Sequence, residues 1–285
     1  MDIVLAIVVF LLAYSCYLNV TFRKKEYNVT SKKVTCNYKI LFISDLHMKR
    51  YGKKNNRLLR KIKQAEPDYI LIGGDLIITY PAAYYGVRNQ YQWLDEICDF
   101  LVQLNKICKV YYVDGNHEIN LRTALDGAYR KIYERYIFEV ERTGTIVLND
   151  NMCRLSCDTL VYGYTEPIEL YAKRNRCQLD KADIKLDISE AEQFKILLTH
   201  NPEHFDTFSE LKVDLVLCGH VHGGMIRIGN RGIISPSYRF MPKYCYGLYK
   251  KNKTIMIVTS GLNMHTIPIR WFNPAEYVII NIVKE

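Results

Sequence analysis

The sequence predicts a mixed α/β fold in which two packed β-sheets carry helices on their outer faces, behind one membrane-spanning helix. Three observations support this prediction. Apolar strand-like runs alternate with amphipathic helical stretches over the first half of the 285-residue chain. Short strand-like runs punctuated by glycine and proline fill most of the second half. An unbroken apolar stretch covers residues 3–22. We therefore expect one large domain of the α/β (α+β) class behind an N-terminal anchor.

The composition narrows the class of partner. Lys and Arg total 39 against 30 Asp and Glu, a formal net charge of +9. This surplus suits a phosphate ester or an anionic lipid surface, and ordinary solubility charge is the alternative. Basic runs interleaved with aromatic residues are absent, so no nucleic-acid partner is expected. No repeat or heptad pattern specifies an oligomeric state.

The apolar N-terminal stretch is long enough to cross the hydrocarbon layer as a helix. A cleaved signal peptide is disfavoured, because no basic segment precedes the stretch and no A-x-A-like site follows it. A buried hairpin of a soluble protein is the third alternative. Residues 23–25 are Arg-Lys-Lys and only Asp2 precedes the stretch, so the positive-inside rule places the body in the cytoplasm. Nine scattered cysteines without a C-x-x-C pair also favour a reducing compartment. We expect a single-pass cell-membrane protein anchored by residues 1–22.

The catalytic domain is predicted over residues 38–285, after a polar segment at 23–37 that is either a linker or an edge strand. The domain begins with an apolar strand at 38–43, directly followed by Asp45 and His47. Ligands bind at the carboxyl ends of strands in open α/β sheets, so these two side chains are candidate site residues.

Two further strands of the first half end in the same way. Asp75 follows the second strand, and Asn116 and His117 follow the third. The tyrosine-rich segment 80–89, close to Asp75, is either one wall of a substrate pocket or an ordinary crossover loop. The predicted elements here are a helix at 55–65, a strand at 69–72, a helix at 90–107, a strand at 109–113 and a helix at 121–138.

The second half is mostly strands, with an irregular charged insertion at 166–192. His200 ends one of these strands, and the pair His220 and His222 follows another, flanked by glycines that allow a sharp turn. The predicted strands lie at 145–148, 153–155, 159–162, 195–199, 213–218, 225–228, 255–258 and 277–282.

Histidine and carboxylate residues thus gather behind strand ends in a way that predicts a metal site. A single buried histidine is most often an ordinary core residue, but five at one edge of the fold are better explained as a cluster of ligands. The candidates are Asp45, His47, Asp75, Asn116, His117, His200, His220 and His222. His204 and His265 fall outside the pattern. Mixed imidazole and carboxylate ligands suit zinc, manganese or iron, and this number of candidates suits two ions about 3.5–4 Å apart.

These residues resemble the conserved blocks of the calcineurin-like metallophosphoesterase family, D-x-H, G-D, G-N-H-D/E, H and G-H-x-H. The resemblance covers residues 39 to about 283, and it implies a four-layer αββα sandwich. Gly223-Gly224 and parts of 261–276 are similar to a bacterial subfamily of membrane-associated phosphodiesterases. The matching blocks are Asp45-Leu46-His47, Gly74-Asp75, Gly115-Asn116-His117-Glu118, His200 and Gly219-His220-Val221-His222.

The resemblance also implies a role for each residue. His117 would contact the phosphate and help to protonate the leaving oxygen, rather than bind metal. Asp75 would bridge two divalent ions, Mn²⁺, Zn²⁺ or Fe²⁺, together with the attacking hydroxide. Asp45, His47 and His222 would hold the first ion, and Asn116, His200 and His220 the second.

The implied activity is hydrolysis of a phosphodiester, phosphomonoester or pyrophosphate, in some relatives on lipid-linked or nucleotide-sugar substrates. The sequence departs from the subfamily pattern at Met225 and in the segment Thr259-Ser260-Gly261-Leu262-Asn263. These departures affect the substrate that the resemblance implies, and they leave the predicted metal site intact. Two alternatives remain open. One is a non-catalytic metal-binding scaffold of the same fold, and the other is a nuclease of the family.

Overall fold

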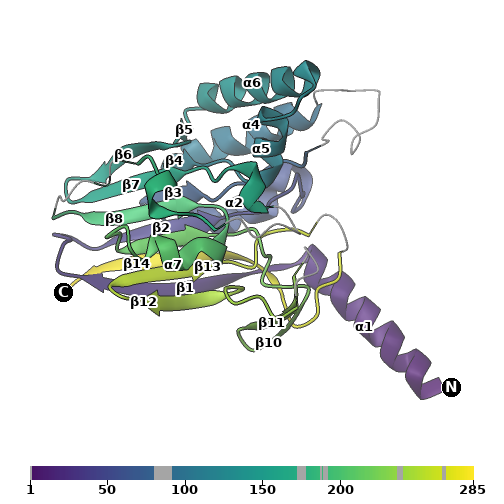
Figure 1. The fold of residues 1–285 in the computed structure, drawn as a ribbon. Helices are drawn as coiled ribbons and strands as arrows, with labels where there is room; N and C mark the ends of the chain where they lie inside the picture. Colours follow the sequence, from purple (N-terminus) through teal and green to yellow (C-terminus); the bar gives the residue numbers. More distant parts are fainter. Residues whose placement is uncertain are drawn as a thin grey trace.

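The fold of the chain, taken from a computed structural model, is built on two six-stranded sheets that pack face to face (Figure 1). The structure describes residues 2–79, 92–171, 178–186, 188, 192–235, 240–264 and 268–285. It confirms the predicted mixed α/β class with two sheets and a long apolar helix at the N-terminus.

The first sheet has the strand order β1-β14-β2-β3-β4-β5. Strands β2 to β5 are parallel neighbours, so their carboxyl ends lie at one edge of the sheet. Strand β14 is antiparallel to β2 and parallel to β1. The bounds are β1 (Phe22–Ser31), β2 (Tyr38–Ile43), β3 (Tyr69–Ile72), β4 (Lys109–Tyr112), β5 (Ile146–Val147) and β14 (Ala275–Lys284).

The second sheet has the order β12-β13-β9-β8-β7-β6, and β7, β8, β9 and β13 are parallel. Its bounds are β6 (Asn151–Ser156), β7 (Thr159–Tyr164), β8 (Phe194–Thr199), β9 (Leu215–Cys218), β12 (Gly247–Lys251) and β13 (Thr254–Val258). A separate antiparallel pair, β10 (Ile226–Ile228) and β11 (Arg231–Ile234), follows β9.

The helices cover the outer face of the first sheet, and shorter turns cover the second. The bounds are α2 (Asn56–Ala65), α4 (Gln92–Asn105), α5 (Asn116–Arg122), α6 (Gly127–Arg142) and α7 (Phe205–Phe208), with 3₁₀ turns η1 (Lys53–Asn55), η2 (Ile168–Tyr171), η3 (Lys181–Asp183) and η4 (Pro202–His204). The single helix predicted at 121–138 is instead divided into α5 and α6. The division lies at 123–126, because Asp126 caps α6 by accepting a hydrogen bond from the Ala128 N–H at 2.8 Å.

Side chains of β2 show how the layers are held together. Leu41 and Ile43 pack with the helices, whereas Ile40 and Phe42 pack into the space between the two sheets. This alternation is the two-residue period of a strand that is buried on both faces. A third cluster lies on the far face of the second sheet, where Phe205 and Phe208 of α7 contribute. The layers are therefore helix, sheet, sheet and a thin layer of turns with α7, which gives the implied αββα order.

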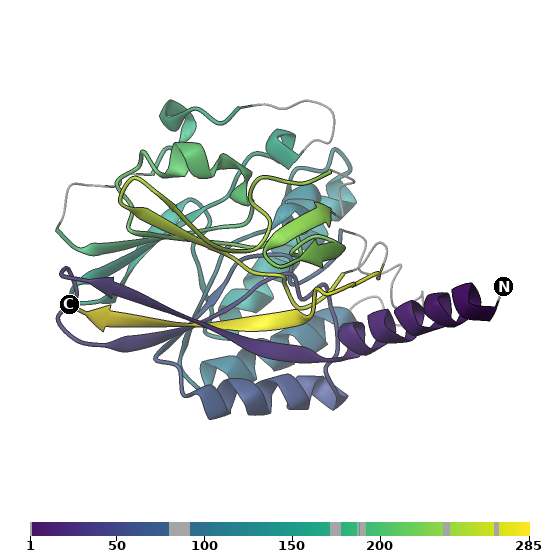
Figure 2. The ribbon, with the colours of Figure 1, turned by 90° about the horizontal axis from the view of Figure 1, so that it is seen from below.

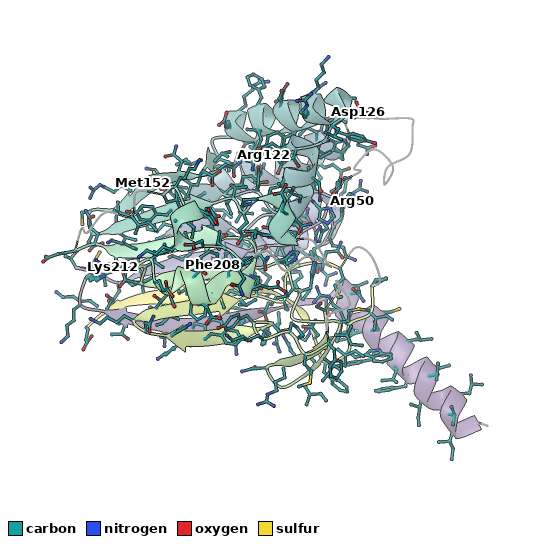
Figure 3. The ribbon with its side chains drawn as sticks, viewed as in Figure 1. Arg50, Arg122, Asp126, Met152, Phe208 and Lys212 are labelled. Carbon is teal, nitrogen blue, oxygen red and sulfur yellow. The ribbon has the colours of Figure 1, made fainter. Side chains whose placement is uncertain are left out.

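Helix α1 (Asp2–Val20) projects away from the body, and most of its side chains extend clear of it (Figures 1, 2 and 3). The window Ile3–Val20 has a mean hydropathy of 2.4 and only 11% of it is buried. This helix is long and apolar enough to cross a membrane.

The segment predicted at 23–37 as a linker or an edge strand is mostly the latter. Strand β1 starts at Phe22 and pairs along its whole length with β14, in a register that runs from Phe22–Ala275 to Ser31–Lys284. Residues 22–31 are therefore the edge strand of the first sheet, which is the second of the two alternatives. The strand lacks an apolar signal because it lies at the sheet edge and only one of its ten residues, Val29, is buried.

Candidate metal centre

The candidate residues converge because the two sheets bring their strand ends to one place. Asp45 and His47 follow β2, Asp75 follows β3, and Asn116 opens α5 just after β4. The second sheet supplies the rest, since His200 follows β8 and the pair His220 and His222 follows β9. Parallel neighbours end side by side, so three strands of one sheet face two of the other across the site.

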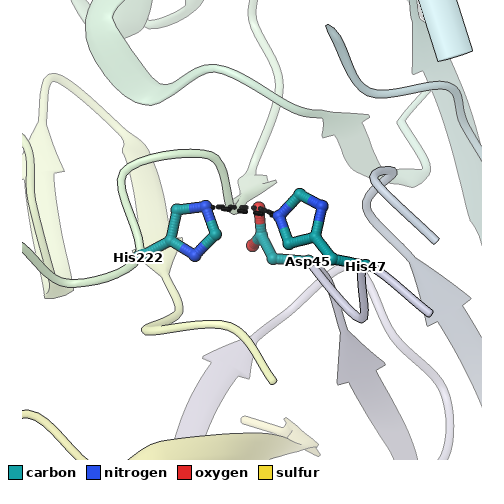
Figure 4. Close-up of side chains that lie close together, drawn as sticks. All are labelled: Asp45, His47 and His222. Atoms are coloured by element: carbon teal, nitrogen blue, oxygen red, sulfur yellow. Dashed lines mark hydrogen bonds and ion pairs between the residues drawn. The ribbon is translucent and has the colours of Figure 1, made fainter. Parts of the chain in front are cut away.

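One group of possible ligands consists of Asp45, His47 and His222 (Figure 4). The Nε2 atoms of the two imidazoles are 3.4 Å apart, and their rings are nearly parallel. Asp45 Oδ1 lies 4.0 Å from His47 Nε2 and 3.7 Å from His222 Nε2. All three residues are buried. Three ligand atoms converge at a spacing that one cation can occupy.

A second group consists of Asp75, His200, His220 and Asn116. Asp75 Oδ2 is 3.1 Å from His200 Nε2. The Asn116 side-chain amide lies 2.8 Å from His220 Nδ1 and also faces Asp75 Oδ2 and His200 Nε2. An amide oxygen, a carboxylate and two imidazoles are all groups that can coordinate a divalent cation. The set of donor atoms therefore fits a divalent ion.

Asp75 lies between the two groups. Its Oδ2 is also 3.8 Å from His47 Nε2, so the same carboxylate belongs to a cluster with His47 and to one with His200. Its other oxygen accepts the backbone N–H of His117 at 2.9 Å. This is the placement that a bridging ligand requires.

Backbone carbonyl groups orient the imidazoles. Nδ1 of His200 is 2.6 Å from the Gly73 carbonyl oxygen, and Nδ1 of His222 is 2.6 Å from that of Asn263. Because a carbonyl only accepts, each Nδ1 must carry the proton, and in the neutral ring the lone pair is then on Nε2. Both Nε2 atoms point into the site, so they present lone pairs where a cation would lie.

The ligand loops adopt backbone conformations that side chains usually avoid. Five of the seven proposed metal ligands have positive φ angles between 44° and 67°, namely Asp45, His47, Asp75, His220 and His222. Such residues cost of the order of 1–3 kcal/mol each and are retained where the surrounding structure holds them. Their concentration at one edge of the fold is typical of a functional site.

The charges in the site balance poorly without a cation. Burial by itself raises the pKa of Asp75, but the surrounding imidazoles of His200, His117 and His47 hold it well below its usual range. Burial lowers the pKa of His200, yet the carboxylates of Asp75 and Asp45 outweigh it and raise that pKa to about 10. Asp45 Oδ2 is buried and has no hydrogen-bond partner. Without a cation, the positive charge that compensates the two carboxylates is therefore supplied by protonated His200.

His117 differs from the other imidazoles in the site. Its Nδ1 lies 2.8 Å from the backbone nitrogen of Thr79, which is a donor, so Nδ1 accepts and the neutral ring carries its proton on Nε2. The ring centroid is 5.0 Å from that of His47. Burial lowers the pKa of His117, which favours the neutral ring at pH 7. This tautomer presents an N–H group, not a lone pair.

Two supporting residues, Glu118 and Asn263, have no metal role in the sequence pattern. Glu118 is fully buried and accepts backbone N–H groups of Asp75, Ile77 and Gly115 at 3.0–3.1 Å, so it ties the Asp75 loop to the start of α5. Asn263 accepts from His222, and its N–H donates to the Asp45 carbonyl at 2.8 Å. The G-N-H-D/E block contains Glu118, but no sequence signal identifies Asn263.

Tyr171, at the end of η2, was also not predicted. Its ring lies edge-on to that of His220 with centroids 5.0 Å apart, and its hydroxyl donates to the buried Glu166 carboxylate. Its neighbour Leu170 lines a cleft of about 560 Å³, together with His204, Phe240 and Met241. His204 therefore lies outside the two ligand groups, as expected. His265 and the 80–89 segment lie outside the described residues.

A family model described as calcineurin-like phosphoesterase matches residues 38–224. An uncharacterised metallophosphoesterase of Campylobacter jejuni is 28% identical over 90% of this chain and 62% of its own length. A phosphodiesterase of Escherichia coli is 25% identical over 67% of this chain and 63% of its own length. The chain thus spans a little under two thirds of the first curated relatives it matches.

A crystal structure of a Thermus thermophilus protein superimposes with a TM-score of 0.45 and 14% identity. The match covers 79% of this chain and 90% of that one.

Proposed function

The chain belongs to the calcineurin-like phosphoesterase family and is a metallophosphoesterase, and from this we propose that it hydrolyses phosphoric esters with a pair of divalent cations. The observation that carries the dinuclear proposal is the position of Asp75 between two groups of ligand atoms. Asp45, His47 and His222 would hold one cation. Asn116, His200 and His220 would hold the other, and Asp75 would contact both.

Bound cations would supply Lewis acidity toward phosphoryl oxygens and lower the pKa of a water molecule. The residues of this chain do the rest. Backbone carbonyls keep the imidazole lone pairs directed inward, which requires no rearrangement when a substrate arrives. His117, in the neutral form that the Thr79 N–H selects, would donate a hydrogen bond from its Nε2–H to the leaving oxygen and so stabilise the charge that develops there as the P–O bond breaks, while the proton that this oxygen finally takes up comes from solvent.

We expect the substrate to be a phosphodiester or a pyrophosphate. The name of the Escherichia coli relative supports a diester, and the excess of basic residues favours an anionic substrate. Anchoring by α1 would concentrate the enzyme near lipid-linked phosphates, with the body in the cytoplasm. A nucleotide-sugar substrate is the soluble counterpart of the same chemistry.

The direct test is turnover of bis-p-nitrophenyl phosphate and p-nitrophenyl phosphate by the full chain in detergent, with Mn²⁺, Zn²⁺, Fe²⁺ or Co²⁺. We expect hydrolysis with at least one of these metals, and a preference for the diester. Asp75→Asn is the matched loss variant, because it keeps the shape of the side chain but removes the bridging charge. A chain that binds two equivalents of metal and hydrolyses neither ester would instead be the non-catalytic scaffold.

The side of the membrane is tested separately. In vesicles from cells that express the full chain, protease added outside should digest the body only when the vesicles are inverted. Digestion in right-side-out vesicles would place the body outside the cell and contradict the cytoplasmic assignment.

A further inference from the structure

Exposed apolar side chains gather beside the base of α1. Outside that helix, the described residues include eight large apolar side chains that are exposed. Val102, Leu125, Phe138 and Met152 are scattered over separate elements of the body. The other four are Ile228, Phe240, Met241 and Phe272, with exposed fractions of 69%, 72%, 50% and 61%. We call these four residues the apron.

The apron residues belong to one connected piece of structure. Ile226 of β10 forms bridges with Trp271 and with Ile234 of β11, and Ile234 in turn forms a bridge with Phe240. The Met241 N–H donates to the Ile233 carbonyl at 2.9 Å. Each apron residue therefore lies in, or next to, a segment that is hydrogen-bonded to the β10–β11 pair. Single exposed apolar residues need no explanation, but a connected group indicates a surface that is covered in use.

The apron is continuous with the apolar surface of α1. The Phe272 ring lies 5.7 Å from that of Tyr14, and the Trp271 indole N–H donates to the Leu11 carbonyl at 3.1 Å. Figures 1 and 2 agree that β10 and β11 lie beside the base of the helix, on the side from which the helix leaves the body. If α1 crosses a bilayer, the apron is therefore the part of the domain that lies nearest to the bilayer surface.

We propose that the apron rests in the interfacial region of a lipid bilayer and fixes the orientation of the metal centre above it. This rests on the membrane anchoring in the proposed function. Phenylalanine, isoleucine and methionine side chains insert at the boundary between headgroups and acyl chains. Arg231 is exposed and is paired directly with Ile228, so a cation stands beside the apolar surface at the depth of the phosphate groups.

The proposed seating has a consequence for substrate access. Phe240 and Met241 also line the cleft that includes Leu170, and the adjacent Tyr171 contacts His220. Asn273, next to Phe272, donates to the His222 carbonyl at 2.7 Å. The apron is thus adjacent to both ligand groups. A lipid-linked phosphate would reach the cleft without leaving the interface.

Brominated-lipid quenching of an introduced tryptophan tests this seating in the full chain. Phe240→Trp places a reporter in the apron, and Phe138→Trp on α6 is the matched control, since Phe138 is 58% exposed and lies outside the apron. The unsubstituted chain supplies the background of Trp93 and Trp271. In phosphatidylcholine vesicles brominated near the headgroup end of the acyl chain, we expect Phe240→Trp to lose roughly half of its added emission. Phe138→Trp should lose none.

Each outcome decides the proposal. Equal quenching of the two reporters would overturn it, and so would a blue-shifted Phe240→Trp emission without quenching, which indicates burial against a protein. Flotation with the vesicles is measured first. If the chain does not float with the vesicles, both the proposed membrane anchoring and the proposed position of the apron are wrong. If the chain floats but quenching is not selective, only the proposed position of the apron is wrong. Phosphoesterase turnover is independent of either result.

Discussion

The protonation of each imidazole in the centre follows from the group that its Nδ1 faces. His200 and His222 face carbonyl oxygens and present a lone pair to the site, whereas His117 faces a backbone N–H and presents a proton. Binding a cation needs a lone pair on Nε2, whereas donating to a substrate oxygen needs an N–H there. The main-chain group that faces Nδ1 thus selects the tautomer that each of these tasks requires. Residue identity alone would not distinguish a ligand from a proton donor.

Replacing His117 should therefore remove activity but not metal. We expect His117→Ala to retain two equivalents of divalent metal and to lose about 10²–10³-fold in kcat, because the leaving oxygen loses the hydrogen bond from Nε2–H. Metal content by atomic emission and kcat on a diester measure the two effects. Arg142→Ala on α6 is the control, because Arg142 is exposed and lies outside both ligand groups. Metal loss in His117→Ala would assign it as a ligand instead.

Metal affinity should rise with pH. In the metal-free site the pKa of His200 is raised to about 10, above its ordinary value. The ring is therefore an imidazolium at neutral pH, with a second proton on Nε2 where the neutral ring would present its lone pair. A cation at Nε2 must expel this proton, and apparent affinity then increases up to about tenfold per pH unit for each displaced proton. Calorimetric titration between pH 6 and 9, in buffers of different ionisation enthalpy, should detect the released proton. A pH-independent affinity would contradict this.

The same raised pKa affects the stability of the metal-free protein. A group whose pKa is higher in the folded state contributes stability below its unfolded pKa, near 6.5, and loses it as pH rises through the folded value. Metal-free protein should therefore be less stable at alkaline pH, and added metal should remove this dependence.

At the scale of elements, one segment joins α1 to the first ligand group. We call residues 259–264 and 268–274 the strap. Arg270 is fully buried there, and its guanidinium donates to the carbonyls of Ser260, Gly261 and Asn273 at 3.1–3.5 Å. Gly261 has a φ of +66°, and a Cβ there would lie 2.7 Å from the Asp45 Cβ, so the strap packs directly behind that ligand.

Loosening the strap should weaken the site without touching a ligand. Arg270→Met keeps much of the side-chain volume but removes the three donors, and each carbonyl left unsatisfied costs about 1–3 kcal/mol. We expect lower metal occupancy at the group containing Asp45, together with reduced stability. Arg142→Met on α6 is the control, because Arg142 is exposed and pairs with Glu139. Unchanged occupancy in Arg270→Met would show that the strap does not position Asp45.

The strands were predictable from sequence where they are buried on both faces. β2, β3, β8 and β9 are short apolar runs, and the site residues follow them directly. By contrast, β1 has four consecutive charged residues and no alternation of apolar and polar side chains along its length, so its pairing with β14 depends on tertiary structure that its own residues do not encode. The role of Asn263 escaped prediction because a loop residue that acts through its main-chain carbonyl and N–H has no spacing pattern.

At the scale of the whole molecule, the two sheets meet at a site where two buried carboxylates lie close together and several residues have strained backbone angles. A cation that binds only the folded form stabilises it by about 2.7 kcal/mol at one hundred times its dissociation constant. For a domain of this size we expect the melting temperature to rise by about 5–10 °C with Mn²⁺ or Zn²⁺. Asp75→Asn should abolish most of this shift. An equal shift in both proteins would indicate metal bound elsewhere.

The pairing of β1 with β14 has a consequence for biosynthesis. Residues 32–274 separate these two strands, so β1 leaves the ribosome on the order of tens of seconds before its partner at typical elongation rates. Helix α1 precedes β1 and can enter a bilayer during this interval. Arg23 and Lys24 on this edge strand are exposed, and charged side chains at a sheet edge discourage association with other chains. A nascent chain that stalls before the strap would therefore be tethered already, yet unable to assemble its catalytic pocket.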